Sequence, residues 1–122
     1  MMNSMVRKAI PESEGASAVR ALLTGSSSRE TIGLAVRYLL QLLAERAPGN
    51  TVEVRVPPFG AVQCIPGPRH TRGTPPNVIE MSADTWCALA TGAMSWDDAL
   101  ASGAISASGQ RASLAGLVPV RY

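Results

Sequence analysis

The side chains best suited to chemistry lie in one proline-rich segment, residues 66–76. It carries two guanidiniums (Arg69 and Arg72), the imidazole of His70 and the hydroxyl of Thr74. Four prolines restrict the backbone, so these side chains can be preorganised at low entropic cost. Guanidinium forks suit the recognition of carboxylate or phosphate. The segment therefore predicts a rigid cationic loop that contacts an anionic group.

A second interpretation of this loop is structural. Its arginines could instead brace a sheet by pairing with acidic side chains elsewhere in the chain, of which the candidates are Glu80, Asp97 and Asp98. The sequence leaves both interpretations open.

Catalytic and metal-binding patterns are weak. His70 is the only histidine, and its spacing from Cys64 does not imply contact between a base and a nucleophile. Cys64 and Cys87 form neither a C-x-x-C motif nor a metal-ligand spacing, and no phosphate-binding glycine motif is present. We expect a protein that is not an enzyme and has no metal or cofactor, with both thiols buried and free.

Length and composition fit one domain. The chain has 122 residues, 46% of them hydrophobic and 16% charged, with a net charge of +2 that is too small to indicate nucleic acid. No apolar run reaches the roughly 18 residues of a membrane span, and no signal peptide opens the chain. We expect a cytoplasmic protein with a flexible lead-in at residues 1–11 and a single domain at 12–122.

Two helices are predicted first. Residues 12–23 form a weak helical pattern, and Ser27 with Glu30 forms a capping box before a second, strongly apolar helix that ends at Pro48-Gly49. The apolar face of this second helix leaves only a narrow polar stripe of Arg37, Gln41 and Glu45. A face that wide must be covered on more than one side. Burial between a sheet and the first helix explains it, and so does one flank that lines a ligand cavity or a subunit contact.

Strands follow. Residues 51–56 alternate, which predicts Val52, Val54 and Val56 on a buried face and Thr51, Glu53 and Arg55 in water. Further strands are expected at 61–65, 77–81 and 104–108. Short helices are expected from a cap at Ser82 or Asp84 to Gly92, from Ser95 to Gly103, and at 110–117. This order is typical of an α+β fold.

With these residues in view, the chain resembles the bacterial sterol-carrier-protein orthologue family, a branch of the sterol carrier protein 2 superfamily. The resemblance runs from about Val54 to Pro119. Its most specific part is the unbroken string from Gly67 to Glu80. The other residues that carry it are Arg55-Val56-Pro57-Pro58, Ala61-Val62-Gln63-Cys64, Trp86 with Leu89-Ala90-Thr91-Gly92, Trp96 with Ala99 and Gly103, and Ser108-Gly109-Gln110-Arg111-Ala112.

The resemblance implies a mainly antiparallel sheet of about five strands with helices packed on one face. It also implies an apolar cavity between sheet and helices for a lipid or fatty-acyl ligand. The ligand-binding residues expected on this basis are Arg69, His70, Arg72, Thr74 and Arg111 for the polar group, and Val36, Leu39, Leu43, Trp86 and Trp96 for the apolar part. Two departures stand out: Ser113 replaces an acidic residue common in the family, and the chain ends Val120-Arg121-Tyr122, without a peroxisomal tripeptide.

The leading hypothesis is thus non-catalytic binding of an apolar or amphiphilic small molecule. One alternative is a protein-interaction module whose cationic loop docks a partner or a second copy in a homodimer. Another is an auxiliary domain associated with a thiol-dependent or isomerase enzyme.

Overall fold

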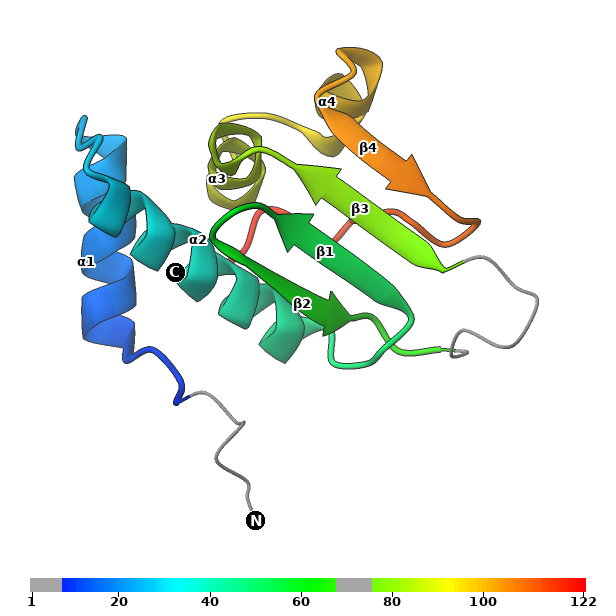
Figure 1. The fold of residues 1–122 in the computed structure, drawn as a ribbon, viewed down its shortest axis with the longest axis horizontal. Coiled ribbons are helices and arrows are strands. Elements are labelled where there is room, and N and C mark those ends of the chain that lie inside the picture. The colour runs from blue at the N-terminus through cyan, green and yellow to red at the C-terminus, as the bar shows by residue number, and fades with distance from the viewer. Residues whose placement is uncertain (1–7, 68–75) are drawn as a thin grey trace.

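The computed structural model describes residues 8–67 and 76–122, which form a sheet with helices packed against it (Figure 1). The elements in chain order are α1 (Glu12–Leu23), α2 (Arg29–Arg46), β1 (Val52–Val56), β2 (Gly60–Cys64), β3 (Asn77–Met81), α3 (Ala83–Thr91), α4 (Trp96–Ala101) and β4 (Ile105–Ser108). The α+β class is confirmed. The expected sheet of about five mainly antiparallel strands is wrong, because the described residues form a mixed sheet of four.

The mixed topology follows from the connection between β2 and β3. The sheet order is β2-β1-β3-β4, and the β1–β2 and β3–β4 pairs are antiparallel. Because β2 runs back along β1, its last residue Cys64 lies opposite Val52. On the other side of β1, Asn77 also lies opposite Val52, so β3 starts at the same end and runs parallel to β1.

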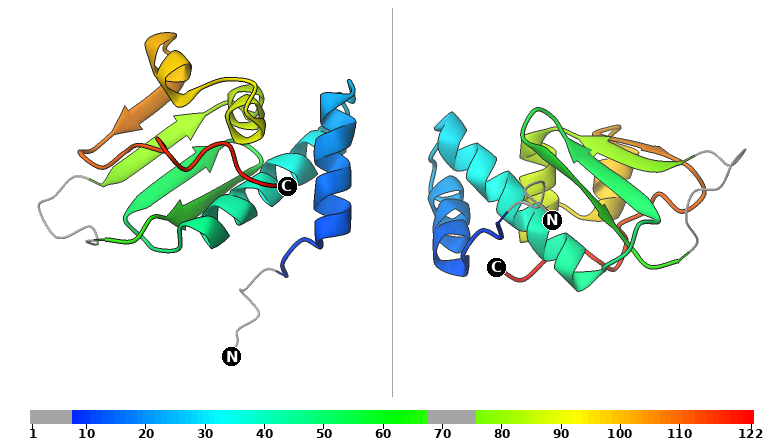
Figure 2. Two further views of the ribbon diagram at one scale, coloured as in Figure 1. Left: turned by 180° about the vertical axis from the view of Figure 1, so that it is seen from behind. Right: turned by 60° about the horizontal axis from the view of Figure 1, so that its bottom comes forward.

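One face of the sheet carries the core and the other faces solvent. Val52, Val54 and Val56 are buried as predicted, together with Ile79 and Met81. Helices and the C-terminal segment lie on this side of the sheet (Figure 2). The opposite face exposes mainly polar or small side chains, namely Arg55, Ala61, Gln63, Glu80, Ser106 and Ser108.

Thr51 was predicted to face water, and this prediction is wrong because the residue is buried. It precedes β1 at the end of the sheet where three segments meet. Its N–H donates to the carbonyl of Ile65 at 3.2 Å, and its own carbonyl accepts from Asn77 Nδ2 at 3.0 Å. These tertiary hydrogen bonds override the local alternation.

The helix starts are set by serine caps. Ser82, one of the two caps predicted for α3, accepts from Thr85 N–H at 3.2 Å. Ser95 caps α4 as predicted and accepts from Asp98 N–H at 3.1 Å. In α2 the cap is Ser28, which accepts from Thr31 N–H at 3.0 Å. The predicted capping box of Ser27 and Glu30 is therefore wrong by one residue, because the helix begins at Arg29.

Helix α2 is the centre of the helical layer. It packs against α1, the sheet and α3, and the indole N–H of Trp86 donates to the carbonyl of Val36 at 3.3 Å. The predicted coverage of α2 on more than one side is therefore confirmed. One flank of the helix is not covered by these elements, and it contributes to the site described below.

The helix predicted at 110–117 is wrong: these residues form turns. Gly109 and Gly116 adopt left-handed backbone conformations that interrupt a helix. The segment instead crosses the helical side of the sheet (Figure 2), where Val120 N–H donates to the carbonyl of Ala90 at 2.9 Å. Arg46 donates to the carbonyls of Gly116 and Pro119, at 3.2 and 3.0 Å, and so fixes this segment to the end of α2.

Candidate functional site

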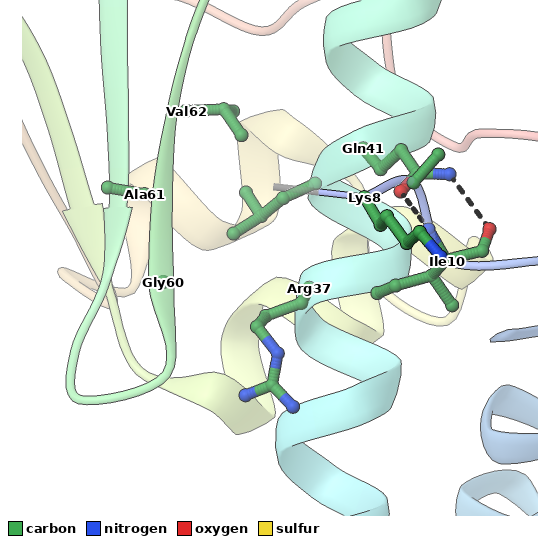
Figure 3. A pocket seen from close by; sticks show the side chains of 9 residues that line it. Lys8, Ile10, Arg37, Gln41, Gly60, Ala61 and Val62 are labelled. Carbon is green, nitrogen blue, oxygen red and sulfur yellow. Dashed lines mark hydrogen bonds between the residues drawn. The ribbon is translucent and has the colours of Figure 1, made fainter. Parts of the chain in front are cut away.

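A partly enclosed cleft of about 620 Å³ lies between α2 and the edge strand β2 (Figure 3). Residues 8–10, which precede α1, form its third wall. The residues that line the cleft are Lys8, Ala9, Ile10, Arg37, Leu40, Gln41, Gly60, Ala61 and Val62. Its volume falls within the range of roughly 300–1,000 Å³ that is typical of small-molecule sites.

The cleft exists because β2 is an edge strand and its first residue has no side chain. A Cβ atom placed on Gly60 would lie 3.4 Å from Arg37 Cγ and 3.5 Å from Leu40 Cδ1. On α2, a Cβ atom on Gly33 would lie 3.0 Å from Arg37 Nη1 and 3.1 Å from the ring of Phe59. The two glycines thus leave room for the long side chain of Arg37 between the helix and the β1–β2 hairpin.

The cleft walls combine apolar surface with positive charge. Ile10, Leu40 and Val62 supply the apolar part, whereas Lys8 and Arg37 are cations, and none of the described residues that line the cleft is acidic. Such a set of side chains is complementary to an anionic amphiphile, since the low local polarity strengthens attraction to a charged group.

Arg37 is the cation best placed to act on a ligand. Its side chain is half-buried, and among the described residues its guanidinium has no carboxylate partner and no hydrogen bond. One neighbouring cation extends the same edge, because the guanidinium of Arg29 lies over the ring of Phe59 at 5.2 Å from the ring centre. The guanidinium of Arg37 therefore keeps its donors available for an anionic group.

Residues 8–10 are fixed to α2 by one side chain. The amide of Gln41 accepts from Ile10 N–H at 2.8 Å and donates to the Ile10 carbonyl at 3.1 Å. Figure 3 shows Gln41 and Ile10 facing each other, with these two bonds dashed. This pairing is what turns a gap beside α2 into a three-sided cleft. Residues 1–7 of the predicted lead-in lie outside the described residues.

The cationic loop predicted as the anion site cannot be placed against the cleft. Arg69, His70, Arg72 and Thr74 all lie outside the described residues, so their contacts stay a prediction. The possible bracing partners Glu80, Asp97 and Asp98 form no ion pair within the described part of the chain.

Arg111 lies at the end of the sheet where the loop begins and ends. Its backbone N–H donates to Asn77 Oδ1 at 2.9 Å, and Asn77 is opposite Val52 in the register. The cleft is at the other end of the strand, because Gly60 is opposite Val56. Four residues of strand separate these ends by roughly 13 Å. Arg111 therefore lies at the Asn77 end of the sheet and does not line the cleft.

The predicted apolar ligand contacts are all in the core. Val36, Leu39, Leu43 and Trp86 are fully buried and Trp96 is 7% exposed. None of the five lines the cleft, so their contact with a ligand also stays a prediction.

Sequence reasoning missed the residues of α2 that do line the cleft. Arg37 and Gln41 belong to the narrow polar stripe on an otherwise apolar helix, and Leu40 lies beside them. A polar stripe is normally a solvated face. The possible role of this stripe in binding is apparent only in the folded structure, where β2 and residues 8–10 surround it.

The two cysteines do not form a reactive centre. Cys64 and Cys87 are both buried and free. Burial raises the pKa of each thiol to about 11, and Asp84 contributes to the rise at Cys87. Both therefore remain protonated at neutral pH, and a protonated thiol is a poor nucleophile.

Residues 8–67 and 76–122 offer no metal site, because they contain no group of three or more histidine, cysteine or acidic side chains placed to hold a metal ion. Within the same ranges, no helix has the length and apolar character needed to cross a bilayer.

Comparison with known proteins identifies the family. Residues 28–120 match the family described as Bacterial SCP ortholog, which includes α2, the whole sheet, α3 and α4. The match spans more than half of the chain, so the protein belongs to this family. No curated protein matches the chain. Helix α1 and residues 8–10 lie before the matched region.

Proposed function

We propose that this member of the bacterial SCP ortholog family is a non-catalytic binding protein for a lipid or fatty-acyl ligand. The ligand occupies the cleft between α2, β2 and residues 8–10. The observation that carries this proposal is the composition of the cleft, whose described lining residues include apolar side chains and two cations but no acidic side chain. Membership of a family of sterol-carrier type supports a small apolar or amphiphilic ligand.

The energetics favour a single acyl chain. Each methylene moved from water into the cleft contributes about 0.8 kcal/mol. Part of that sum is offset by the lost freedom of the chain and by ordering of nearby side chains. The cleft is partly open, so some methylenes stay wet. We therefore expect dissociation constants near the micromolar range, about 8 kcal/mol of binding free energy.

The polar end of the ligand is assigned to Arg37. Its half-buried guanidinium has no carboxylate partner among the described residues, and it can form two parallel hydrogen bonds with a carboxylate or phosphate. Lys8 adds a second, exposed positive charge at the same cleft. Head-group contact by Arg111, and by Arg69, His70, Arg72 and Thr74, which lie outside the described residues, remains a separate prediction.

The direct test is to fill the cleft. Gly60→Leu places a branched side chain toward Arg37 Cγ and Leu40 Cδ1, the atoms nearest to a Cβ at this position. We expect a dansyl-labelled fatty acid to bind the wild-type protein and to bind Gly60→Leu at least tenfold more weakly in a fluorescence titration.

The matched control is Ser106→Leu, which adds the same side chain to an exposed position of the other edge strand, β4. This control is expected to bind as the wild type does. A wild-type protein that does not bind the probe, or equal affinity of all three proteins, would contradict the proposal.

A further inference from the structure

The third wall of the cleft is a short segment of chain that is weakly attached to the rest of the molecule. We call Lys8–Ile10 the N-terminal strap. Lys8 and Ala9 are exposed and Ile10 is half-buried against the core. The strap lies directly before α1, and none of it belongs to the region that matches the family.

Two hydrogen bonds hold the strap to the rest of the described structure. Both join Ile10 to the Gln41 side chain, one in each direction. Residues 8–10 form no other hydrogen bond with residues 8–67 or 76–122. An amide side chain satisfies a peptide N–H and a peptide carbonyl at once, as a neighbouring strand would. Release of the strap thus exchanges these two hydrogen bonds for bonds to water and exposes the buried part of Ile10.

The fastening residue lies in the cleft itself. Gln41 lines the cleft together with Leu40 and Arg37 of the same helix. A ligand in the cleft would therefore contact both the strap and the side chain that holds it. When the strap is closed, it covers the ligand on one side. When it is released, the cleft is open along that side from α2 to β2.

We propose that the N-terminal strap is a gate over the cleft and that Gln41 is the positioning residue that closes it. The inference rests on the proposed function, because it assigns to the strap the entry and exit of the ligand. Closure slows ligand dissociation, and a bound ligand in turn stabilises the closed strap, because the ligand contacts the strap only when the strap is closed.

The test compares Gln41→Met with Gln63→Met. The first variant keeps the length of the side chain but removes both hydrogen bonds to Ile10. The second makes the same change at an exposed position of β2, on the solvent face. Dissociation of a dansyl-labelled fatty acid is followed by stopped-flow fluorescence. Gln41→Met is expected to release the probe roughly tenfold faster, the ratio that corresponds to the loss of one to two net hydrogen bonds. Gln63→Met should stay within about twofold of the wild type.

A second measurement keeps the inference testable if Gln41→Met also lowers stability. Hydrogen exchange at the Ile10 amide reports the strap alone. In the wild type, the probe is expected to slow this exchange, whereas in Gln41→Met the exchange should be fast and insensitive to the probe. A wild type that binds the probe, with unchanged dissociation in Gln41→Met and no effect of the probe on Ile10 exchange, overturns the gate. A wild type that does not bind the probe overturns the proposed function first.

Discussion

Arg37 decides which ligands the cleft can discriminate. Its guanidinium is half-buried, lies between Gly33 and Gly60, and has no acidic partner in the described part of the chain. Burial has already removed part of the water around this guanidinium, so little further desolvation opposes the binding of an anion. The charge-assisted hydrogen bonds to that anion then contribute more to affinity than those of an exposed arginine. The charge of the ligand should therefore matter more at this residue than the length of its chain.

We predict that Arg37→Gln weakens binding of a fatty acid about tenfold and leaves a fatty alcohol of the same chain length almost unchanged. A charge-assisted hydrogen bond contributes about 1.5–3 kcal/mol, and partial exposure reduces this. Competition titrations against a fluorescent probe measure both ligands.

Arg20→Gln is the control, since Arg20 is exposed on α1 and does not line the cleft. Equal losses for acid and alcohol in Arg37→Gln would mean that Arg37 does not recognise the head group.

At this scale, only part of the candidate site follows from the sequence. The sequence predicts anion-binding residues where cations gather, at 66–76, and that prediction stays open. The structure also brings Arg37 and Lys8, 29 positions apart in sequence, to one cleft. No local sequence pattern predicts that Arg37 and Lys8 lie together, because their proximity depends on residues 8–10 folding back to Gln41.

At the scale of elements, α1 packs closely on α2. The ring of Tyr38 on α2 lies directly against Gly15 of α1, and a Cβ atom on Gly15 would overlap the ring. Glycine at position 15 is therefore a packing requirement inside a helix that would otherwise prefer alanine. Burial of the Tyr38 side chain raises the pKa of its hydroxyl, and the carboxylates of Glu12 and Glu45 add to this rise.

We predict that Gly15→Ala lowers the free energy of unfolding by about 1–2 kcal/mol. Helix propensity alone would raise it by up to about 1 kcal/mol. The clash with the Tyr38 ring outweighs this gain, because overpacking costs typically 1–3 kcal/mol and the ring is enclosed. Urea denaturation followed by circular dichroism measures the difference.

The comparison variant is Ser17→Ala, at an exposed position of the same helix, where the propensity gain acts without a clash. If Gly15→Ala were as stable as Ser17→Ala, the close packing of α1 on α2 would be contradicted.

Local signals predicted the elements well, and tertiary constraints account for the errors. The bounds of α1 and β3 and the caps Ser82 and Ser95 follow from residues within one turn or one strand. The helix predicted at 110–117 does not form. In the C-terminal segment, the backbone N–H of Arg111 donates to Asn77 and that of Val120 donates to Ala90. The parallel pairing of β1 and β3 depends on the end of the sheet at which β2 ends. The alternation of residues within a single strand does not specify that position.

At the scale of the whole molecule, the site results from a sheet covered on one face only. Strand β2 has one neighbour in the sheet, and α2 extends along its free side (Figure 1). The family-matched region supplies these two walls, while residues 8–10 from outside that region supply the third. The walls of the cleft thus come both from the family-matched region and from a segment that precedes it.

The central claim is that the ligand lies between α2 and β2. The most direct measurement is a map of backbone amide chemical shifts while oleic acid is added to labelled protein. We predict saturable chemical-shift changes that are centred on Arg37, Leu40 and Gly60–Val62 and extend to Ile10. The absence of saturable shifts, or shifts centred on the solvent face at Glu80 and Ser106 with none at the cleft, would contradict it.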